Sequence, residues 1–400
     1  MTVTLSSRAK NTNPSATLAI ASSAKRMKAE GFDVVDFGLG EPDFETPAHV
    51  KEAAIQAIRE GFTKYTAAGG IDELKEAIIT KLKRDNGLSY SRAEVIASCG
   101  SKHTLFNIAE VLLEPGDEVI IPAPYWVTYT EQIRLVGGRP VIVQTREEDG
   151  FHLSRQVVEP TITPRTKAIL VNSPCNPTGA VVPLEQLKAI AALAVERDLL
   201  LVSDEAYETL TYDGRAHVSI ASLDEEVKRR TIVVNTVSKA YAMTGWRIGY
   251  AAGPAEIIKA MGDIQGQTTS NPTSIAQKAA IAALLGPQDD VRAMVAEFDR
   301  RRRYLVGRLN AIPGLRCANP EGAFYLFPNF SAFYGRKSNG GPIRNSAEMA
   351  TYLLQNAHVA LVPGADFGSD SHLRLSYATP MEAIVKGADR LERALGALRA

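Results

Sequence analysis

The sequence predicts an α/β protein, with a mostly parallel sheet flanked by helices and a smaller α+β domain after it. From about Pro47 to Leu285, short apolar runs alternate with helical stretches, which is the pattern of strand–helix units in a parallel sheet. A chain of 400 residues also exceeds what one small core requires and favours about two domains. We therefore expect the large sheet first and the smaller domain beyond it.

The expected elements follow the apolar pattern in order along the chain. Strands of the sheet are predicted from 95 and at 118–121, 140–143, 168–171, 199–202, 231–234 and 248–252, with helices at 184–196 and 274–285. A charged helix over 290–309 leads out of the sheet, and its arginines at 300–303 indicate a solvated or interface face. The runs at 324–327, 359–362 and 373–377 predict the smaller domain. We expect a segment at 1–46 that joins the small domain, a large domain at 47–289 and a small C-terminal domain at 290–400.

The composition argues against several classes of protein. Lysine plus arginine and aspartate plus glutamate each total 45, so the net charge is zero and no global field recruits nucleic acid or a membrane. The three cysteines, Cys99, Cys175 and Cys317, follow no disulfide or zinc pattern and indicate a reducing compartment. No apolar stretch approaches the length that spans a membrane.

A lysine beside a serine is the strongest chemical signal in the chain. Ser238 and Lys239 follow the apolar run at 231–234, where a strand would end in a loop, and Arg247 comes shortly after. Pyridoxal phosphate requires an amine that forms a Schiff base, with a hydroxyl and a guanidinium to hold its phosphate. A solvated surface lysine is the alternative for a lone lysine, and the neighbouring residues argue against it.

A carboxylate is expected at the end of another strand. The apolar run at 199–203 is typical of a strand buried on both faces, and it ends in Asp204, with Tyr207 three residues on. Ligands of open parallel sheets bind at the carboxyl ends of the strands. A buried Asp204 would keep the cofactor's ring nitrogen protonated, and Tyr207 would contact its phenolic oxygen. The alternative is that Asp204 caps a helix and Tyr207 is a core aromatic.

A third polar site follows the apolar run at 168–171. The sequence Asn-Ser-Pro-Cys-Asn-Pro-Thr-Gly at 172–179 predicts a rigid turn, stiffened by Pro174 and Pro177. Asn176 lies between the prolines and would hold its side-chain amide in one place. If this motif stood alone, an ordinary loop with Asn176 in an Asx-turn would be favoured.

The order of these motifs resembles the fold-type I pyridoxal phosphate aminotransferases, and most closely the bacterial aspartate aminotransferases of class I. The likeness runs from about Pro14 to the C-terminus, with the longest stretches PSATLAI, LGEPDFETP, KYTAAGGI, PGDEVIIPAPYWVTY, NSPCNPTG, SKAYAMTGWRIGYAAGP, EGAFYLFP and LRLSYA. The resemblance implies a seven-stranded sheet in the large domain, pyridoxal 5'-phosphate as cofactor, and amino-acid and 2-oxo-acid substrates.

The same resemblance bears on assembly and location. It implies a homodimer in which Tyr65 is donated across the interface to the neighbouring subunit's phosphate; otherwise Tyr65 is a packed aromatic before a turn. Residues 1–29 contain no acid and by composition would fit a transit peptide. Because the likeness already begins near Pro14, a cytoplasmic protein is preferred.

The phosphate pocket is expected to extend to a glycine turn. Gly100, Ser101 and Lys102 stand between a strand and a helix, and backbone amides at a helix N-terminus bind anions without particular side chains. These three residues would join Ser238 and Arg247 around the phosphate.

Further residues are expected to contact the substrate. Trp126 can stack on the pyridine face and donate its N–H to a carboxylate, and Gly40 lets the backbone approach closely. Arg374 lies in a strand-like run that would otherwise exclude charge, so a buried Arg374 needs an anion such as the substrate's α-carboxylate. The alternatives are a core tryptophan and an outward-facing arginine. The resemblance adds Asn176 to both the cofactor and the substrate contacts.

The predicted activity is transamination between an L-amino acid and a 2-oxo acid. Lys239 binds the cofactor, is displaced by the incoming amino group and then moves a proton as general base. A lyase reaction such as β-elimination on the same cofactor is the alternative within catalysis. A cofactor-sensing regulator would need a DNA-binding module before Pro14. A nicotinamide dehydrogenase would need a complete glycine fingerprint, which Gly-Leu-Gly at 38–40 lacks.

L-Aspartate and 2-oxoglutarate are the expected substrate pair. The resemblance places Lys102 against the distal carboxyl, with Ser15 and Thr17 nearby; a surface residue in the first turn of a helix is the alternative for Lys102.

Relatives that also use prephenate carry a lysine where this chain has Asn13. An amide supplies no charge, and charge-assisted hydrogen bonds are roughly twice as strong as neutral ones. Weak or absent prephenate activity is therefore expected, unless Asn13 contacts nothing. Specificity for aromatic amino acids or for alanine is the alternative to the aspartate assignment.

Overall fold

The computed structural model describes residues 3–12, 16–338 and 341–399 of the chain. Its largest sheet has seven strands in the spatial order β2-β8-β7-β6-β5-β3-β4. These are β2 (Val95–Ser98), β3 (Glu118–Ala123), β4 (Arg139–Gln144), β5 (Thr166–Asn172), β6 (Leu200–Asp204), β7 (Thr231–Thr236) and β8 (Gly249–Ala252). Neighbouring strands are parallel except that β8 runs antiparallel to both β2 and β7. The predicted, mostly parallel seven-stranded sheet is confirmed.

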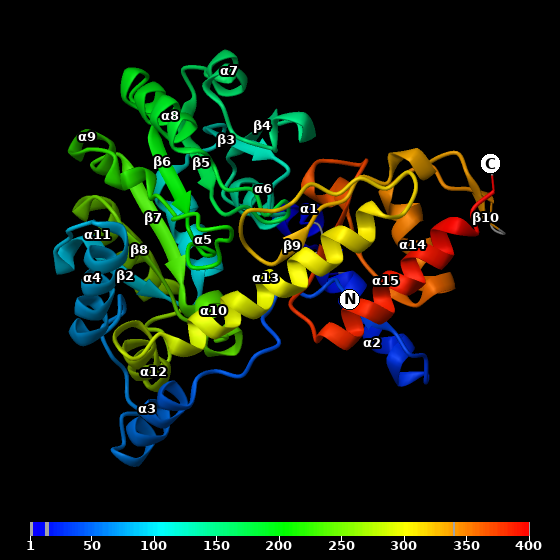
Figure 1. The fold of residues 1–400 in the computed structure, drawn as a ribbon. Coiled ribbons are helices and arrows are strands. Elements are labelled where there is room, and N and C mark those ends of the chain that lie inside the picture. Colours follow the sequence, from blue (N-terminus) through cyan, green and yellow to red (C-terminus); the bar gives the residue numbers. More distant parts are fainter. Residues whose placement is uncertain (1–2, 13–15, 339–340, 400) are drawn as a thin grey trace.

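Helices cover both faces of this sheet, because successive strand residues point to opposite sides and both sides are apolar. In β6, Leu201 packs into one apolar layer and Val202 into the other. The layer of Val202 contains α5 (Ser101–Leu112), α6 (Thr128–Leu135) and α11 (Ala255–Thr268). The opposite face is covered by α3 (Ala48–Arg59), α4 (Asp72–Asn86), α8 (Leu184–Glu196) and α12 (Ser274–Leu285). Three short helices, α7 (Arg155–Val158), α9 (Glu225–Lys228) and α10 (Val237–Ala240), lie in the connections (Figure 1).

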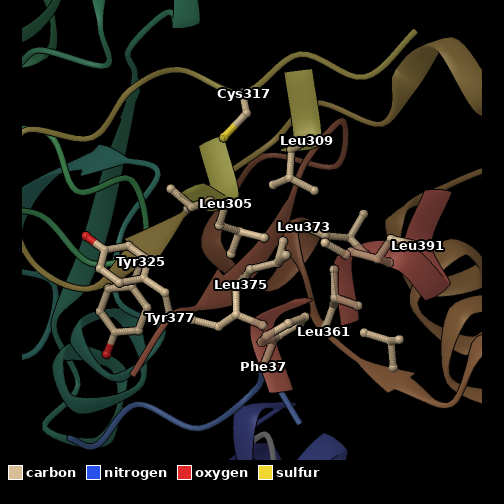
Figure 2. Close-up of a cluster of buried hydrophobic side chains, with 14 of the residues drawn as sticks. Phe37, Leu305, Leu309, Cys317, Tyr325, Leu361, Leu373, Leu375, Tyr377 and Leu391 are labelled. Atoms are coloured by element: carbon tan, nitrogen blue, oxygen red, sulfur yellow. The ribbon is translucent and has the colours of Figure 1, made fainter. Parts of the chain in front are cut away.

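A long helix, α13 (Asp289–Asn310), runs from beside the large sheet to a smaller region that contains α14 (Ser346–Ala357) and α15 (Met381–Gly396) (Figure 1). There β9 (Tyr325–Leu326), β14 (Leu373–Ser376) and β13 (Val362–Pro363) form an antiparallel sheet. Figure 2 shows side chains of α13, of this sheet and of α15 packed with Phe37 in one apolar core.

Part of the N-terminal segment pairs with the smaller region. After α1 (Ser7–Asn11) and α2 (Ala16–Ala29), β1 (Val35–Asp36) pairs in parallel with β12 (Val359–Ala360). A further pair, β10 (Lys337–Ser338) and β11 (Gly341–Pro342), is antiparallel. Within the part of the chain described, no helix combines the length and apolarity needed to cross a membrane.

The run of four arginines on α13 is only partly solvated, which corrects the prediction. Its first and last members are exposed, but Arg301 and Arg302 are buried. A guanidinium nitrogen of Arg301 lies 2.7 Å from a carboxylate oxygen of Asp43, and one of Arg302 lies 2.8 Å from Asp213. Because the side chains of adjacent helical residues point in different directions, some arginines of the run extend into solvent and others into the protein interior.

Candidate active site

A cavity of about 260 Å³ lies at the carboxyl ends of β5, β6 and β7, between the large sheet and the small antiparallel sheet. Of the predicted site residues whose side chains the structure describes, all but Gly100 and Tyr65 line it. The residues that line the cavity are Gly40, Ser101, Lys102, Trp126, Tyr129, Asn172, Asn176, Asp204, Ala206, Tyr207, Ser238, Lys239, Thr244, Arg247, Tyr325 and Arg374.

Lys239 lies in α10, directly after β7. The turn between them is shaped by Thr236, whose hydroxyl accepts a hydrogen bond from the Ser238 backbone N–H at 3.1 Å. The Lys239 amine donates to the Gly40 carbonyl oxygen at 2.5 Å. Burial, and then the positive charge of Arg374, lower the pKa of Lys239 to about 8. A large fraction of the amine is therefore unprotonated at mildly alkaline pH, as a nucleophile or base requires.

Asp204 is the last residue of β6 and is buried. Its Oδ2 accepts a hydrogen bond from the Tyr129 hydroxyl at 2.7 Å, and its Oδ1 accepts one from the Ala206 N–H at 3.2 Å. Burial raises the pKa of Asp204 to about 6, while the two hydrogen bonds oppose the rise. Residues 206–209 form a turn, so the alternative in which Asp204 caps a helix is wrong.

Tyr207 is both a buried aromatic and a cavity residue. Its hydroxyl is 2.8 Å from the hydroxyl of Tyr325, and its ring meets the ring of Phe324 edge-on, with centroids 5.4 Å apart. The Tyr325 hydroxyl also limits position 40, because a Cβ atom on Gly40 would lie only 2.8 Å from it. Glycine at position 40 thus leaves room for Tyr325 as well as for a ligand.

Arg374 is a buried cation on β14. Its two terminal nitrogens donate to Asn176 Oδ1 at 3.0 Å and to the Gly38 carbonyl oxygen at 2.7 Å, while its Nε has no partner. Among the described residues, no carboxylate forms an ion pair with it; its guanidinium instead lies 4.5 Å from the ring centre of Tyr325. Burial lowers the pKa of Arg374. The alternative of an outward-facing arginine is wrong, because the side chain is buried and lines the cavity.

The opposite end of the cavity is cationic. Ser101 and Lys102 begin α5, and Gly100 precedes them with φ of 85°. A Cβ atom on Gly100 would clash with the Arg247 guanidinium, so the glycine lets that cation reach the start of the helix. Arg247 is held by the Thr244 carbonyl oxygen, to which its Nη1 donates at 2.8 Å. Backbone amides and a guanidinium therefore face the same space.

Lys102 and Trp126 lie side by side at the cavity. The Lys102 ammonium is 5.1 Å from the centre of the Trp126 ring, and the ring of Trp126 meets that of Tyr129 edge-on with centroids 5.4 Å apart. Trp126 is only partly buried, so it is not a core tryptophan. The indole and the ammonium thus form one wall of the cavity.

Tyr65 lies outside the cavity. It is 91% exposed and does not line the cavity, so it is not a packed aromatic. Ser15 lies outside the described residues, as do Asn13 and the side chain of Thr17.

Sequence reasoning missed several residues. Tyr129 and Tyr325 line the cavity through hydroxyls that bond to Asp204 and Tyr207, and both stand inside motifs that had been recognised without giving them a role. Gly249 was also missed; a Cβ atom there would clash with the backbone of Ser101. Tyr129 follows the apolar run of β3 by a few residues, whereas Tyr325 lies within the run at 324–327 and leaves no separate signal.

Asp204 makes stability without cofactor depend on pH. Its folded pKa of about 6 exceeds the usual 3.8, so its contribution to stability is fully present below 3.8 and is lost as the pH rises through 6. A shift of about 2 units corresponds to about 3 kcal/mol. We expect the unfolding free energy of the wild type, relative to Asp204→Asn, to fall by about 3 kcal/mol over that range. Denaturant unfolding of the cofactor-free proteins measures this difference, and parallel pH profiles would contradict it.

Comparisons with known proteins agree with this geometry. Residues 33–391 match the family model described as aminotransferase class I and II. An aspartate aminotransferase of Geobacillus stearothermophilus is 51% identical over 97% of this chain and 98% of its own length. An aspartate/prephenate aminotransferase of Nitrosomonas europaea is 47% identical over 97% of this chain and 98% of its own. The crystal structure of the aspartate aminotransferase from Rhizobium meliloti, 44% identical, superposes with a TM-score of 0.96 and covers 99% of this chain and 100% of that one. The chain therefore belongs to the class I and II aminotransferases and has their fold-type I architecture.

Proposed function

We propose that this aminotransferase uses pyridoxal 5'-phosphate to exchange amino groups between L-aspartate and 2-oxoglutarate. The observation that carries the proposal is the buried guanidinium of Arg374, which faces the same cavity as Lys239 and Asp204 and pairs with no carboxylate of the described chain. An uncompensated buried charge is costly. The α-carboxylate of an amino acid would supply the missing anion in bidentate geometry.

The side chains around the cavity fit this cofactor by their chemistry. The start of α5, with Gly100, Ser101 and Lys102, and the side chains of Ser238 and Arg247 offer amides, hydroxyls and cations for a phosphate. When bound, the cofactor supplies an electron sink for negative charge at the substrate's α-carbon.

The far end of the cavity suits the pyridine ring. Asp204 is buried and ionised at neutral pH, so it can hold a proton on the ring nitrogen. Tyr129 donates to Asp204 and thereby orients it. We assign Tyr207 and Asn176 to the phenolic oxygen, and Trp126 to one face of the ring.

Lys239 would act first as a nucleophile and then as a base. Its pKa of about 8 leaves a sizeable fraction of the amine unprotonated, as a nucleophile toward the cofactor's aldehyde would require. Once freed by the substrate amine, Lys239 would serve as the general base that moves a proton between the substrate's α-carbon and C4′ of the cofactor. The Gly40 carbonyl oxygen, which accepts from the amine in the structure, holds Lys239 beside the substrate position.

Substrate recognition would use both ends of a dicarboxylate. Arg374 takes the α-carboxylate, and Asn176 orients the guanidinium through the hydrogen bond to its Oδ1. Gly40 and Trp126 border the same space. We assign Lys102 to the distal carboxylate, with Ser15 and Thr17 of the N-terminal segment as further contacts.

A substrate panel tests the assignment. We expect aspartate to exceed alanine and aromatic amino acids by more than about tenfold in kcat/KM with 2-oxoglutarate, which is roughly 1.4 kcal/mol of transition-state binding. Prephenate should be a poor acceptor, and Asn13→Lys should improve it without a matching gain for aspartate. A tenfold preference for alanine or aromatic amino acids would overturn the aspartate assignment, and equal prephenate rates of the two proteins would show that position 13 has no role.

We further propose a cytoplasmic homodimer in which Tyr65 reaches the phosphate of the partner subunit. Two observations support the dimer: the Tyr65 side chain projects into solvent, and a second cavity of about 850 Å³ shares Lys102 and Arg247 with the first. The free thiols of the three cysteines support a reducing location.

We also propose domain boundaries after residues 46 and 289, which the pairing of β1 with β12 and the start of α13 support.

A further inference from the structure

A second group of charged side chains lies behind the segment 204–208, at the end of β6. Asp204 and Tyr207 of this segment line the cavity, whereas Glu205 and Glu208 do not. Both glutamates are buried; Glu208 pairs with the buried Lys81, and Glu205 lies against the His217 side chain, which is 6% exposed. Lys81 comes from α4 and His217 from the loop after this segment, so three separate segments meet here.

Glu208 is fully paired. It forms an ion pair with Lys81, and its two carboxylate oxygens accept hydrogen bonds from the side-chain amides of Asn86 and Asn235, both at 2.7 Å. Burial opposes ionisation of Glu208, but the charges of Lys81 and His217 outweigh it and lower its pKa. Glu208 is therefore an anion whose charge Lys81 balances.

Glu205 lies against His217. Its Oε1 accepts from the hydroxyls of Ser203 at 2.9 Å and Ser219 at 2.6 Å. Its Oε2 lies 3.1 Å from the imidazole Nε2 of His217, and among the described residues neither this oxygen nor either imidazole nitrogen has a hydrogen-bond partner. Burial alone would lower the pKa of His217, but Glu205 and then Glu208 reverse this and raise it, against the repulsion of Lys81. With His217 protonated, two carboxylates face two cations and the buried charges cancel.

The group is connected to both catalytic strand ends. Glu205 adjoins Asp204 in the chain, and its negative charge helps to raise the pKa of Asp204. Glu208 holds Asn235, whose side-chain oxygen accepts from the Thr236 N–H at 2.7 Å. Thr236 in turn shapes the turn that carries Lys239.

We propose that His217 is a buried imidazolium which, with Lys81, balances Glu205 and Glu208, and that these four residues position Asp204 and Lys239. The inference rests on the proposed function, since it assigns positioning residues to the same site. The ligand atoms of Glu205, Glu208 and His217 lie within 4.8 Å of one another, a spacing that a metal ion could also bridge. Lys81 already forms an ion pair with Glu208, and its ammonium would repel a divalent ion bound there. A proton on His217 is therefore favoured over a metal ion.

The protonation of His217 can be measured directly. In the holoenzyme with isotopically labelled histidines, the His217 resonance is assigned by its loss in His217→Gln or in Glu205→Gln/His217→Gln. We expect it to titrate above its usual pKa of 6.5, and its pKa to fall in Glu205→Gln, where the nearer carboxylate that opposes the effect of burial is gone. Titration below 6.5, or no change in Glu205→Gln, would overturn the proposal. So would a shift of the wild-type resonance on adding EDTA, which would indicate a bound metal.

The positioning role has its own readout. In His217→Gln the charge of Glu205 is unbalanced, so we expect the pH at which the bound cofactor's visible absorption changes to shift, with kcat lowered about tenfold, or 1.4 kcal/mol, and KM nearly unchanged. The double variant Glu205→Gln/His217→Gln removes both charges and should recover most of the loss. His152→Gln is the matched control, since His152 does not belong to this group. An unshifted absorption profile in His217→Gln, or no recovery in the double variant, would contradict the role. Absence of transamination in the wild type would instead refute the proposed function and leave the titration of His217 unaffected.

Discussion

Replacing Lys239 with alanine is expected to lower kcat for transamination by about 10⁴-fold or more, because it removes both the nucleophile and the general base. The site offers little compensation. The other lysine that lines the cavity, Lys102, lies against Trp126 near the cationic end. Steady-state assays with aspartate and 2-oxoglutarate measure the loss, and the cofactor should remain partly bound through the phosphate contacts.

A second measurement separates loss of chemistry from loss of cofactor. Borohydride should attach the cofactor covalently to the wild type and not to Lys239→Ala. Lys188→Ala, which changes an exposed lysine on α8, is the control and should behave as the wild type in both assays. Turnover by Lys239→Ala at the wild-type rate would refute the mechanism.

Replacing Arg374 with leucine is expected to lower kcat/KM for aspartate by about 30-fold to several thousandfold, that is by about 2 to 5 kcal/mol. The guanidinium is buried and has no carboxylate partner within the described chain, so its removal takes away the proposed counter-ion of the α-carboxylate. Arg374→Lys keeps a charge but loses the planar fork, and should fall between the wild type and Arg374→Leu.

The control for Arg374 is a substrate without the α-carboxylate. A simple amine should react slowly with the wild type, and Arg374→Leu should not slow that reaction further. Arg303→Leu, on the exposed side of α13, should keep the wild-type kcat/KM for aspartate. If Arg374→Leu lowered the rates of aspartate and amine equally, the residue would support the fold of the site rather than bind the carboxylate.

Much of the fold and the site could be predicted locally. A strand buried on both faces is an apolar run, and the polar residue that follows it lies at the end of the strand. Asp204 after the run at 199–203 and the pair Ser238–Lys239 after 231–234 are such residues. Because β5, β6 and β7 are parallel, their carboxyl ends meet at one edge of the sheet, which brings these residues together.

The hydrogen bonds that orient these side chains could not be predicted from apolar runs. Lys239 donates to Gly40 across 199 positions, and Arg374 bonds to Asn176 across 198. No apolar pattern specifies how two such distant segments face each other, since that depends on the packing of whole layers. The Tyr129 hydroxyl on Asp204 is a third case, because it also depends on how a helix sits over the sheet.

The sequence by itself indicated the succession of sheet strands, and the lysine and the acid that follow two of them, because each is marked by its place at the end of an apolar run. Only the tertiary structure decided the charge states. Arg374 is a cation without a carboxylate partner in the described chain, and Glu205, Glu208, Lys81 and His217 form a balanced buried group. Burial and the distance to other charges set these states, and both are properties of the packed chain rather than of any local pattern.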